Sequence, residues 1–211
     1  MSYGFDESTS QSSGANVMAP GINENVKLVN AVYEPAKSDG SGDMVLRFNF
    51  ETLTGAKFSH VEWSIDDDRE RNNARQWGKD PEEHLKSRYV AQSERIFHIL
   101  TVFVPREVLI KSVGKTDSFA TFSNALVTAL GTNHVDRLVR IKVILNKKDY
   151  LTFPMRAIKP FIQTMEEPNK LAIDSKWERI ERMTPTDEGS MTTSWEETPK
   201  EAPSTAGEPD W

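Results

Sequence analysis

The chain has 211 residues, contains no cysteine and carries a formal net charge of −6. Its length and its 37% of hydrophobic residues suit one core of ordinary size with extensions, and are small for two domains. Without cysteine, disulfides, thiolate metal sites and cysteine nucleophiles are excluded. No apolar stretch approaches the roughly 18 residues of a membrane span, and the polar start of the chain does not look like a secretory signal. We therefore expect a soluble, cytoplasmic protein that makes no membrane contact.

The net charge is concentrated at the two ends of the chain. Residues 183–211 hold seven acids and one base, Lys200, and so account for −6 on their own. Residues 1–24 hold three acids and no base, which leaves +3 for residues 25–182. Both ends are poor in large apolar side chains and cannot offset an ordering entropy of about 1 to 2 kcal/mol per residue. We predict a disordered arm over 1–24, a folded and mildly basic domain over 25–182, and a disordered acidic tail over 183–211.

The first half of the predicted domain reads as strands. Residues 26–33 favour a strand and 35–42 a turn-rich stretch. Apolar residues alternate over 44–50 and again over 57–65, so these two segments predict a hairpin that turns at 53–56. Residues 66–79 are almost entirely polar and predict a loop.

The second half alternates helices with strands. Asp80 and Pro81 predict the start of a helix that runs to about Arg95. Residues 96–104 are apolar on both faces and predict a central strand that ends at Pro105. An amphipathic helix is expected over 118–130 with Gly131 as its cap. Strands follow at 138–145 and 150–155 around a polar turn, and a last short helix at 170–181.

The order of these elements indicates the fold class. It is mainly β, with about six strands and two inserted helices. Consecutive hairpins with a helix between the third and fourth strands favour an OB-fold-like antiparallel barrel with disordered tails. A split sheet with two packed helices is the alternative.

Residue types for catalysis are scarce. The four histidines are scattered, without the spacing that metal ligation favours, and phosphate-binding glycine loops and serine elbows are absent from the sequence. Asp66, Asp67 and Asp68 could bind Mg²⁺, but they do not fit the calcium-loop pattern. We expect a protein that is not an enzyme and has no cofactor or metal. A metal-dependent nuclease centred on these aspartates is kept as a rival.

Basic and aromatic residues are mixed at three places, which is the combination that single-stranded nucleic acid requires. Cations track the phosphates, while a flat aromatic ring stacks on an unpaired base. The predicted nucleic-acid-binding residues come from the first hairpin, from the polar segment after it and from the last hairpin: Arg47, Lys57 and Trp63; Arg71, Arg75, Trp77 and Lys79; Arg140, Lys142, Lys147, Lys148 and Tyr150. Ordinary solvated faces, and a core position for Trp63, are the alternatives.

The acidic tail ends in an aromatic residue, which a partner protein can bind. It finishes on Glu208, Pro209, Asp210 and Trp211, and an aromatic ring beside a carboxylate can enter a basic-rimmed apolar pocket. A tail of 29 residues spans about 30 Å and can therefore reach much of its own domain. We expect its negative charge to compete with a polyanion for the basic surface of that domain.

In this layout the chain resembles the single-stranded DNA-binding proteins of bacteria and their bacteriophages. Glu208, Asp210 and Trp211 carry the resemblance at the tail, although Trp is last here and the bacterial Ile-Pro-Phe ending is absent. The segment KKDYLTFP, preceded by RIKVILN, also looks like the closing hairpin of some phage members.

The resemblance implies a protein that coats single-stranded DNA with little sequence preference in replication, recombination and repair. Its tail would recruit replication and recombination proteins, in the host cytoplasm if a phage encodes it. Homo-oligomerisation is left open. The main alternative is a structural or adaptor protein of a virion, in which the β-domain packs against other subunits.

Overall fold

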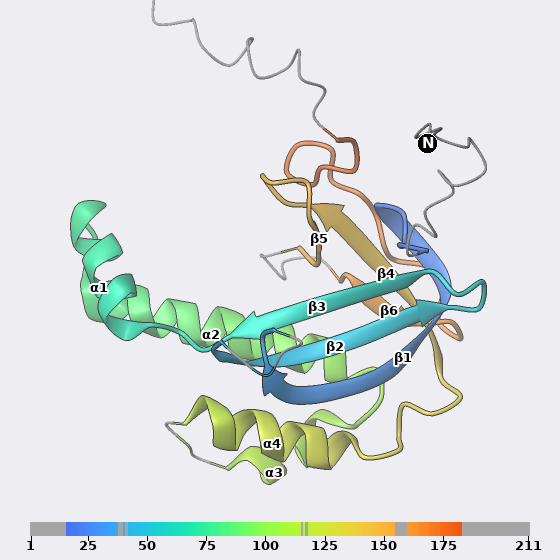
Figure 1. The fold of residues 1–211 in the computed structure, drawn as a ribbon, viewed down its shortest axis with the longest axis horizontal. Helices are drawn as coiled ribbons and strands as arrows, with labels where there is room; N and C mark the ends of the chain where they lie inside the picture. The colour runs from blue at the N-terminus through green and yellow to red at the C-terminus, as the bar shows by residue number, and fades with distance from the viewer. Residues whose placement is uncertain are drawn as a thin grey trace, which may run out of the picture. The chain divides into compact units, whose positions relative to one another are not determined.

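The computed structural model describes residues 16–37, 40, 42–114, 116, 118–154 and 160–182. These residues form a mixed α/β fold with six strands and four helices (Figure 1). The predicted arm up to residue 15 and the whole acidic tail, with Glu208, Asp210 and Trp211, lie outside the described residues.

The strands form one open antiparallel sheet in the order β3-β2-β1-β4-β5, and β6 also pairs with β4. The bounds are β1 Gly21–Pro35, β2 Met44–Thr52, β3 Lys57–Trp63, β4 Leu138–Leu145, β5 Leu151–Thr152 and β6 Ile162–Thr164. The expected barrel is not shown, since β3 and β5 are the two ends of the strand path.

Strand β1 is shared by both halves of the sheet. Its N-terminal part pairs with β4, from Gly21 opposite Val143 to Lys27 opposite Leu138. Its C-terminal part pairs with β2, from Val26 opposite Thr52 to Pro35 opposite Met44. The register shifts within each pairing, and such bulges bend a strand and increase its twist. In Figure 1, β4 runs at an angle to β2 and β3.

The predicted strands in the first hairpin are confirmed because their period-2 pattern matches a sheet with one buried face. Phe48 and Phe50 of β2 are buried beside Phe58 of β3, and the intervening residues point to the other face. The predicted strand at 138–145 is also confirmed. Strand β1 starts at Gly21, and the backbone of Met18 donates to Lys57 (3.0 Å), so the fold includes residues 16–24 that the sequence had assigned to the arm.

The helices are α1 Asp67–Gln76, α2 Pro81–Leu100, α3 Arg106–Val113 and α4 Phe119–Leu130. The start of α2 at the Asp80 cap and the whole of α4 were predicted. The strand predicted at 96–104 is wrong, because α2 continues to Leu100 and a turn follows. The loop predicted at 66–79 is largely α1, and the helix predicted at 170–181 does not form.

The core lies between the sheet and helices α2, α3 and α4. Ile96, Ile99 and Leu100 of α2, Leu109 of α3 and Leu126 of α4 are buried in the same cluster as Phe48 and Phe50. In Figure 1, α2 passes behind β2 and β3, and α4 lies beneath β1. On the opposite face of β2 and β3, the side chains of Lys57, Ser59 and Trp63 are exposed.

Candidate nucleic-acid interface

The solvent face of the β1–β2–β3 meander carries the first group of predicted binding residues. We call it the outer sheet face; its members are Arg47 and Asn49 of β2 and Lys57, Ser59, Val61 and Trp63 of β3. Alternation places these side chains opposite the buried phenylalanines. Trp63 is 51% exposed, so it is not a core residue.

Side-chain hydrogen bonds hold the outer sheet face in place. Asn49 donates to the Asn30 side-chain oxygen (2.7 Å) and accepts from the Ser59 hydroxyl (2.6 Å). Arg47 donates to the Glu34 carboxylate (2.5 Å) and to the backbone oxygen of Ala36 (3.0 Å). The Arg47 charge is thus partly offset but fixed in position.

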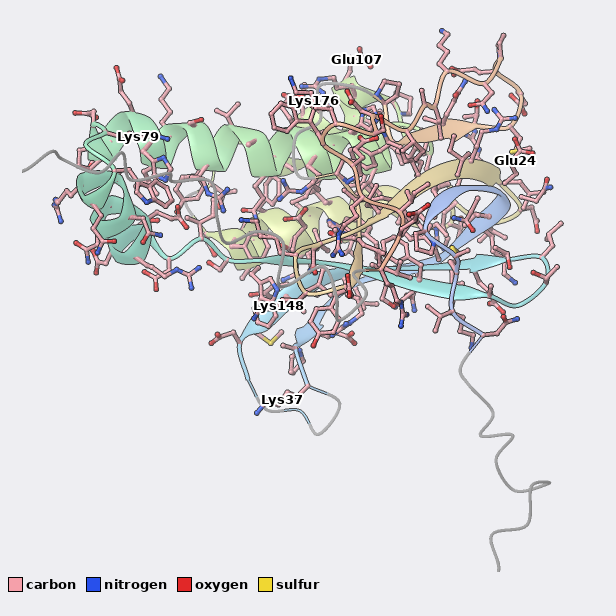
Figure 2. The ribbon with its side chains drawn as sticks, turned by 90° about the horizontal axis from the view of Figure 1, so that it is seen from above. Glu24, Lys37, Lys79, Glu107, Lys148 and Lys176 are labelled. Carbon is pink, nitrogen blue, oxygen red and sulfur yellow. The ribbon has the colours of Figure 1, made fainter. Side chains whose placement is uncertain are left out.

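The loop between β1 and β2 borders this face beside Trp63, because Trp63 pairs with Val45 at the start of β2. An open hollow of about 580 Å³ lies here, lined by Arg47 of β2, by Glu34 and Pro35 at the end of β1, and by the loop residues Ala36, Lys37 and Gly40. Lys37 is exposed on this loop (Figure 2). Lys37 is not among the predicted binding residues, because a lone lysine among turn residues gives no local signal in the sequence.

The turn between β4 and β5 presents the third group. Lys147, Lys148 and Tyr150 are exposed, Tyr150 by 67%. The Asn146 side-chain oxygen accepts from the backbone N–H groups of Lys148 (2.8 Å) and Tyr150 (3.1 Å), which fixes the turn. Strand β5 is limited to Leu151–Thr152, and Met155 of the predicted strand lies outside the described residues.

The second predicted group lies on a helical pair instead of a loop. Asp66 caps α1 by accepting from the backbone of Arg69 (3.0 Å), and α1 is followed by Trp77, which is 58% exposed. Lys79 lies 5.4 Å from the Trp77 ring centre, and His84 meets the ring edge-on at 5.6 Å. Trp77 and Lys79 therefore form a smaller exposed platform.

Arginines of α1 are partly engaged by neighbouring polar groups. Arg71 donates to Glu82 (2.8 Å), and this hydrogen bond raises the pKa of Arg71 above its ordinary value despite an opposing effect of desolvation. Arg75 donates to the Asn72 side chain (2.8 Å). Both guanidinium groups are held on the helix surface, and Arg71 is largely neutralised.

Arg140 and Lys142 do not lie on a free surface, which corrects the prediction for them. Both faces of β4 are covered, one by the core and the other by the segment that follows β6. The Lys142 side chain is 0% exposed and its ammonium donates to Glu178 (2.6 Å). Arg140 donates to Glu24 (2.7 Å). The side chains of these two residues are engaged within the fold, so neither is a candidate for contact with nucleic acid.

A buried polar cluster joins α2 to β3, and the sequence analysis missed it. The Arg95 guanidinium donates to both Glu62 oxygens, at 2.7 Å for the second contact, and His60 lies 2.8 Å from Glu62. Burial alone would raise the pKa of Glu62, but the Arg95 and His60 hydrogen bonds outweigh it and lower the pKa to about 2. Glu62 shares the period-2 strand face of Phe58 and His60, and this spacing is the one sequence signal of its burial.

Within the described part of the chain, no three His, Asp or Glu side chains are grouped so that they could hold a metal ion. Asp66 caps a helix, and Asp67 accepts from the Tyr89 hydroxyl (2.6 Å). The described helices include none with the length and apolar character of a membrane span.

Comparison with family models, with curated proteins and with solved structures finds no match to this chain. Function is therefore inferred from the residues and their geometry.

Proposed function

We propose that this protein binds single-stranded DNA with little sequence preference, without catalysis, and that the outer sheet face and its two neighbouring loops form the interface. The observation that carries the proposal is the exposed Trp63 beside the fixed Arg47 on β2 and β3. Strands 2 and 3 of OB-folds, with the loops after strands 1 and 4, are where those folds bind oligonucleotides.

The strand arrangement supports an OB-fold-like relationship, in which the barrel is left open between β3 and β5. Helices separate the third strand from the fourth, as in that fold. Phe153, directly after β5, packs against Phe58 (5.0 Å) and His60 (4.9 Å) of β3. Side chains thus bridge the gap that strand pairing leaves open.

The charges of the loops support binding to a polyanion. Lys37, Lys147 and Lys148 are exposed on the two loops, and the exposed rings of Trp63 and Tyr150 can each stack on a base. A stacked base contributes about 1 to 3 kcal/mol with little dependence on sequence. Phosphate contacts make the affinity fall as salt rises.

The rest of the proposal comes from the sequence. The protein would act in replication, recombination and repair in the cytoplasm of a phage host, and the tail residues Glu208, Asp210 and Trp211 would recruit partner proteins.

Fluorescence anisotropy with labelled oligo-dT tests the proposal at low and high salt. We expect binding at low salt that weakens as salt rises, and weaker binding by Trp63→Ala and Tyr150→Ala. The control is Val108→Ala, an exposed position on α3. If the wild type does not bind at low salt, the proposal is wrong; a stable oligomer in the same sample would favour a virion structural protein.

A further inference from the structure

The segment after β6 forms a strap over β4, and we call residues 165–181 the C-terminal strap. The buried Lys142 ammonium donates to the backbone oxygen of Ala172 (2.9 Å) and to the Glu178 carboxylate (2.6 Å). The backbone N–H of Leu145 donates to the oxygen of Arg179 (2.7 Å). The strap is therefore anchored to β4 on both sides of residue 177.

This anchored strap holds Trp177 outward. A turn bonds the backbone N–H groups of Trp177 and Glu178 to the oxygen of Asp174 (2.9 and 2.7 Å), and the Glu178 side chain accepts from the Asp174 N–H (2.8 Å). Trp177 is 74% exposed, more than Trp63 or Trp77. Single exposed apolar residues are common on protein surfaces, so exposure alone does not indicate a site.

Two further observations distinguish Trp177 from an incidental surface residue. Lys176 places its ammonium 5.0 Å from the Trp177 ring centre, so a cation accompanies the ring (Lys176 is labelled in Figure 2). Arg179 donates to the backbone oxygen of Asn146 and pairs with Asp149 (2.5 Å). The strap is thus bonded to the β4–β5 turn that carries Lys147, Lys148 and Tyr150.

From this geometry we infer that Trp177 is an additional base-stacking residue and that Lys176 contacts a phosphate of the same bound strand. The interface then extends from the β4–β5 turn onto the C-terminal strap. One ring face of Trp177 takes the base while the adjacent ammonium balances the phosphate charge. This inference rests on the proposed function, because it assigns two more residues to the same DNA site.

The test measures the affinity of the full-length protein for fluorescein-labelled oligo-dT about 20 nucleotides long, which exceeds the usual site of one OB-fold. Trp177→Ala is expected to weaken binding about 5- to 150-fold, the range given by loss of one stacked base. Trp177→Phe keeps a smaller ring and should give an intermediate loss. Val108→Ala serves as the control and should bind like wild type.

A second measurement separates a phosphate contact from a structural effect. Lys176→Gln should reduce the slope of log affinity against log salt by about 0.7, the value for one phosphate contact on a single strand. An unchanged slope would overturn the role of Lys176. Wild-type affinity in Trp177→Ala would overturn the stacking role and leave Trp177 as a surface for a protein partner. In both cases the wild type still binds DNA, whereas failure of the proposed function would show as no binding by the wild type.

Discussion

The buried pair of Lys142 and Glu178 allows a quantitative prediction about stability. Glu178→Gln removes the negative charge that faces a fully buried ammonium, which keeps its hydrogen bond to the backbone oxygen of Ala172. Breaking a buried ion pair from one side costs about 3 to 5 kcal/mol, a large part of the roughly 5 to 15 kcal/mol that stabilises an ordinary domain. We therefore expect the free energy of unfolding to fall by about that amount.

The partner substitutions show whether the charge itself is responsible. Lys142→Met together with Glu178→Gln removes both charges, so the double variant should be more stable than Glu178→Gln alone. Lys142→Met alone should cost less than Glu178→Gln, since the Glu178 side chain is 10% exposed and keeps its bond from Asp174.

Urea unfolding at neutral pH, followed by circular dichroism, measures these differences, and comparable slopes against urea show that the same transition is compared. A loss below about 1 kcal/mol in Glu178→Gln, or a double variant less stable than the single one, would refute the reasoning. Because Lys142 is removed from the interface, the salt slope of DNA binding should be the same in Lys142→Met as in wild type.

Three more results are expected. The pKa of Glu62 is lowered from 4.5 to about 2, which corresponds to a contribution of about 3 kcal/mol to the free energy of unfolding. This contribution is complete above pH 4.5 and is lost as the pH falls toward 2. Urea unfolding across this pH range should show the loss in wild type, and Glu62→Gln should not show it. Trp63→Ala should weaken oligo-dT binding by about 1 to 3 kcal/mol, and equal affinities would exclude a stacking role. A chain ending at Arg182 should bind oligo-dT more tightly than the full chain at low salt, with a smaller difference at high salt; equal affinities at low salt would contradict competition by the tail.

The parts of the fold that were predictable are those whose signals are local. The alternation over 44–50, the Asp80 cap with Pro81, and Ser118 with Gly131 each define an element within a few residues, and the structure has these elements. The strand predicted over residues 96–104 was wrong because a short apolar run fits a buried helix end as well as a central strand. In α2, Ile96, Ile99 and Leu100 instead share the buried face of a helix.

Helix α1 gives little sequence signal because it has almost no apolar face. Its stability depends on Asp66 at the cap and on contacts with α2, where Glu70 lies 3.0 Å from His84 and Ala74 is buried. Such contacts join residues that are distant in the sequence. Periodicity in the sequence therefore identified α4 and missed α1.

In the candidate site, too, local signals were predictable from the sequence and tertiary contacts were not. Residue type and alternation correctly indicated exposure for Lys57, Lys147, Lys148 and Tyr150. Alternation also indicated a solvent face for Arg140 and Lys142, but the other face of β4 is covered by a strap whose Glu178 is 36 residues away from Lys142. The burial of that face depends on tertiary structure, so the sequence of β4 alone could not reveal it.

The shared strand β1 has a consequence for how the chain folds during synthesis. The C-terminal half of β1 can pair with β2 as soon as β2 has been synthesised. The N-terminal half can pair only after β4 has been synthesised, since Lys27 pairs with Leu138. Pairing across such a separation is slow because the loop must close before the contacts form. Until then, the edge of β1 from Gly21 to Lys27, which includes Ile22 and Val26, lacks its partner strand and is exposed to aggregation. The time needed to synthesise residues 36–137 therefore sets how long this edge of β1 lacks its partner strand.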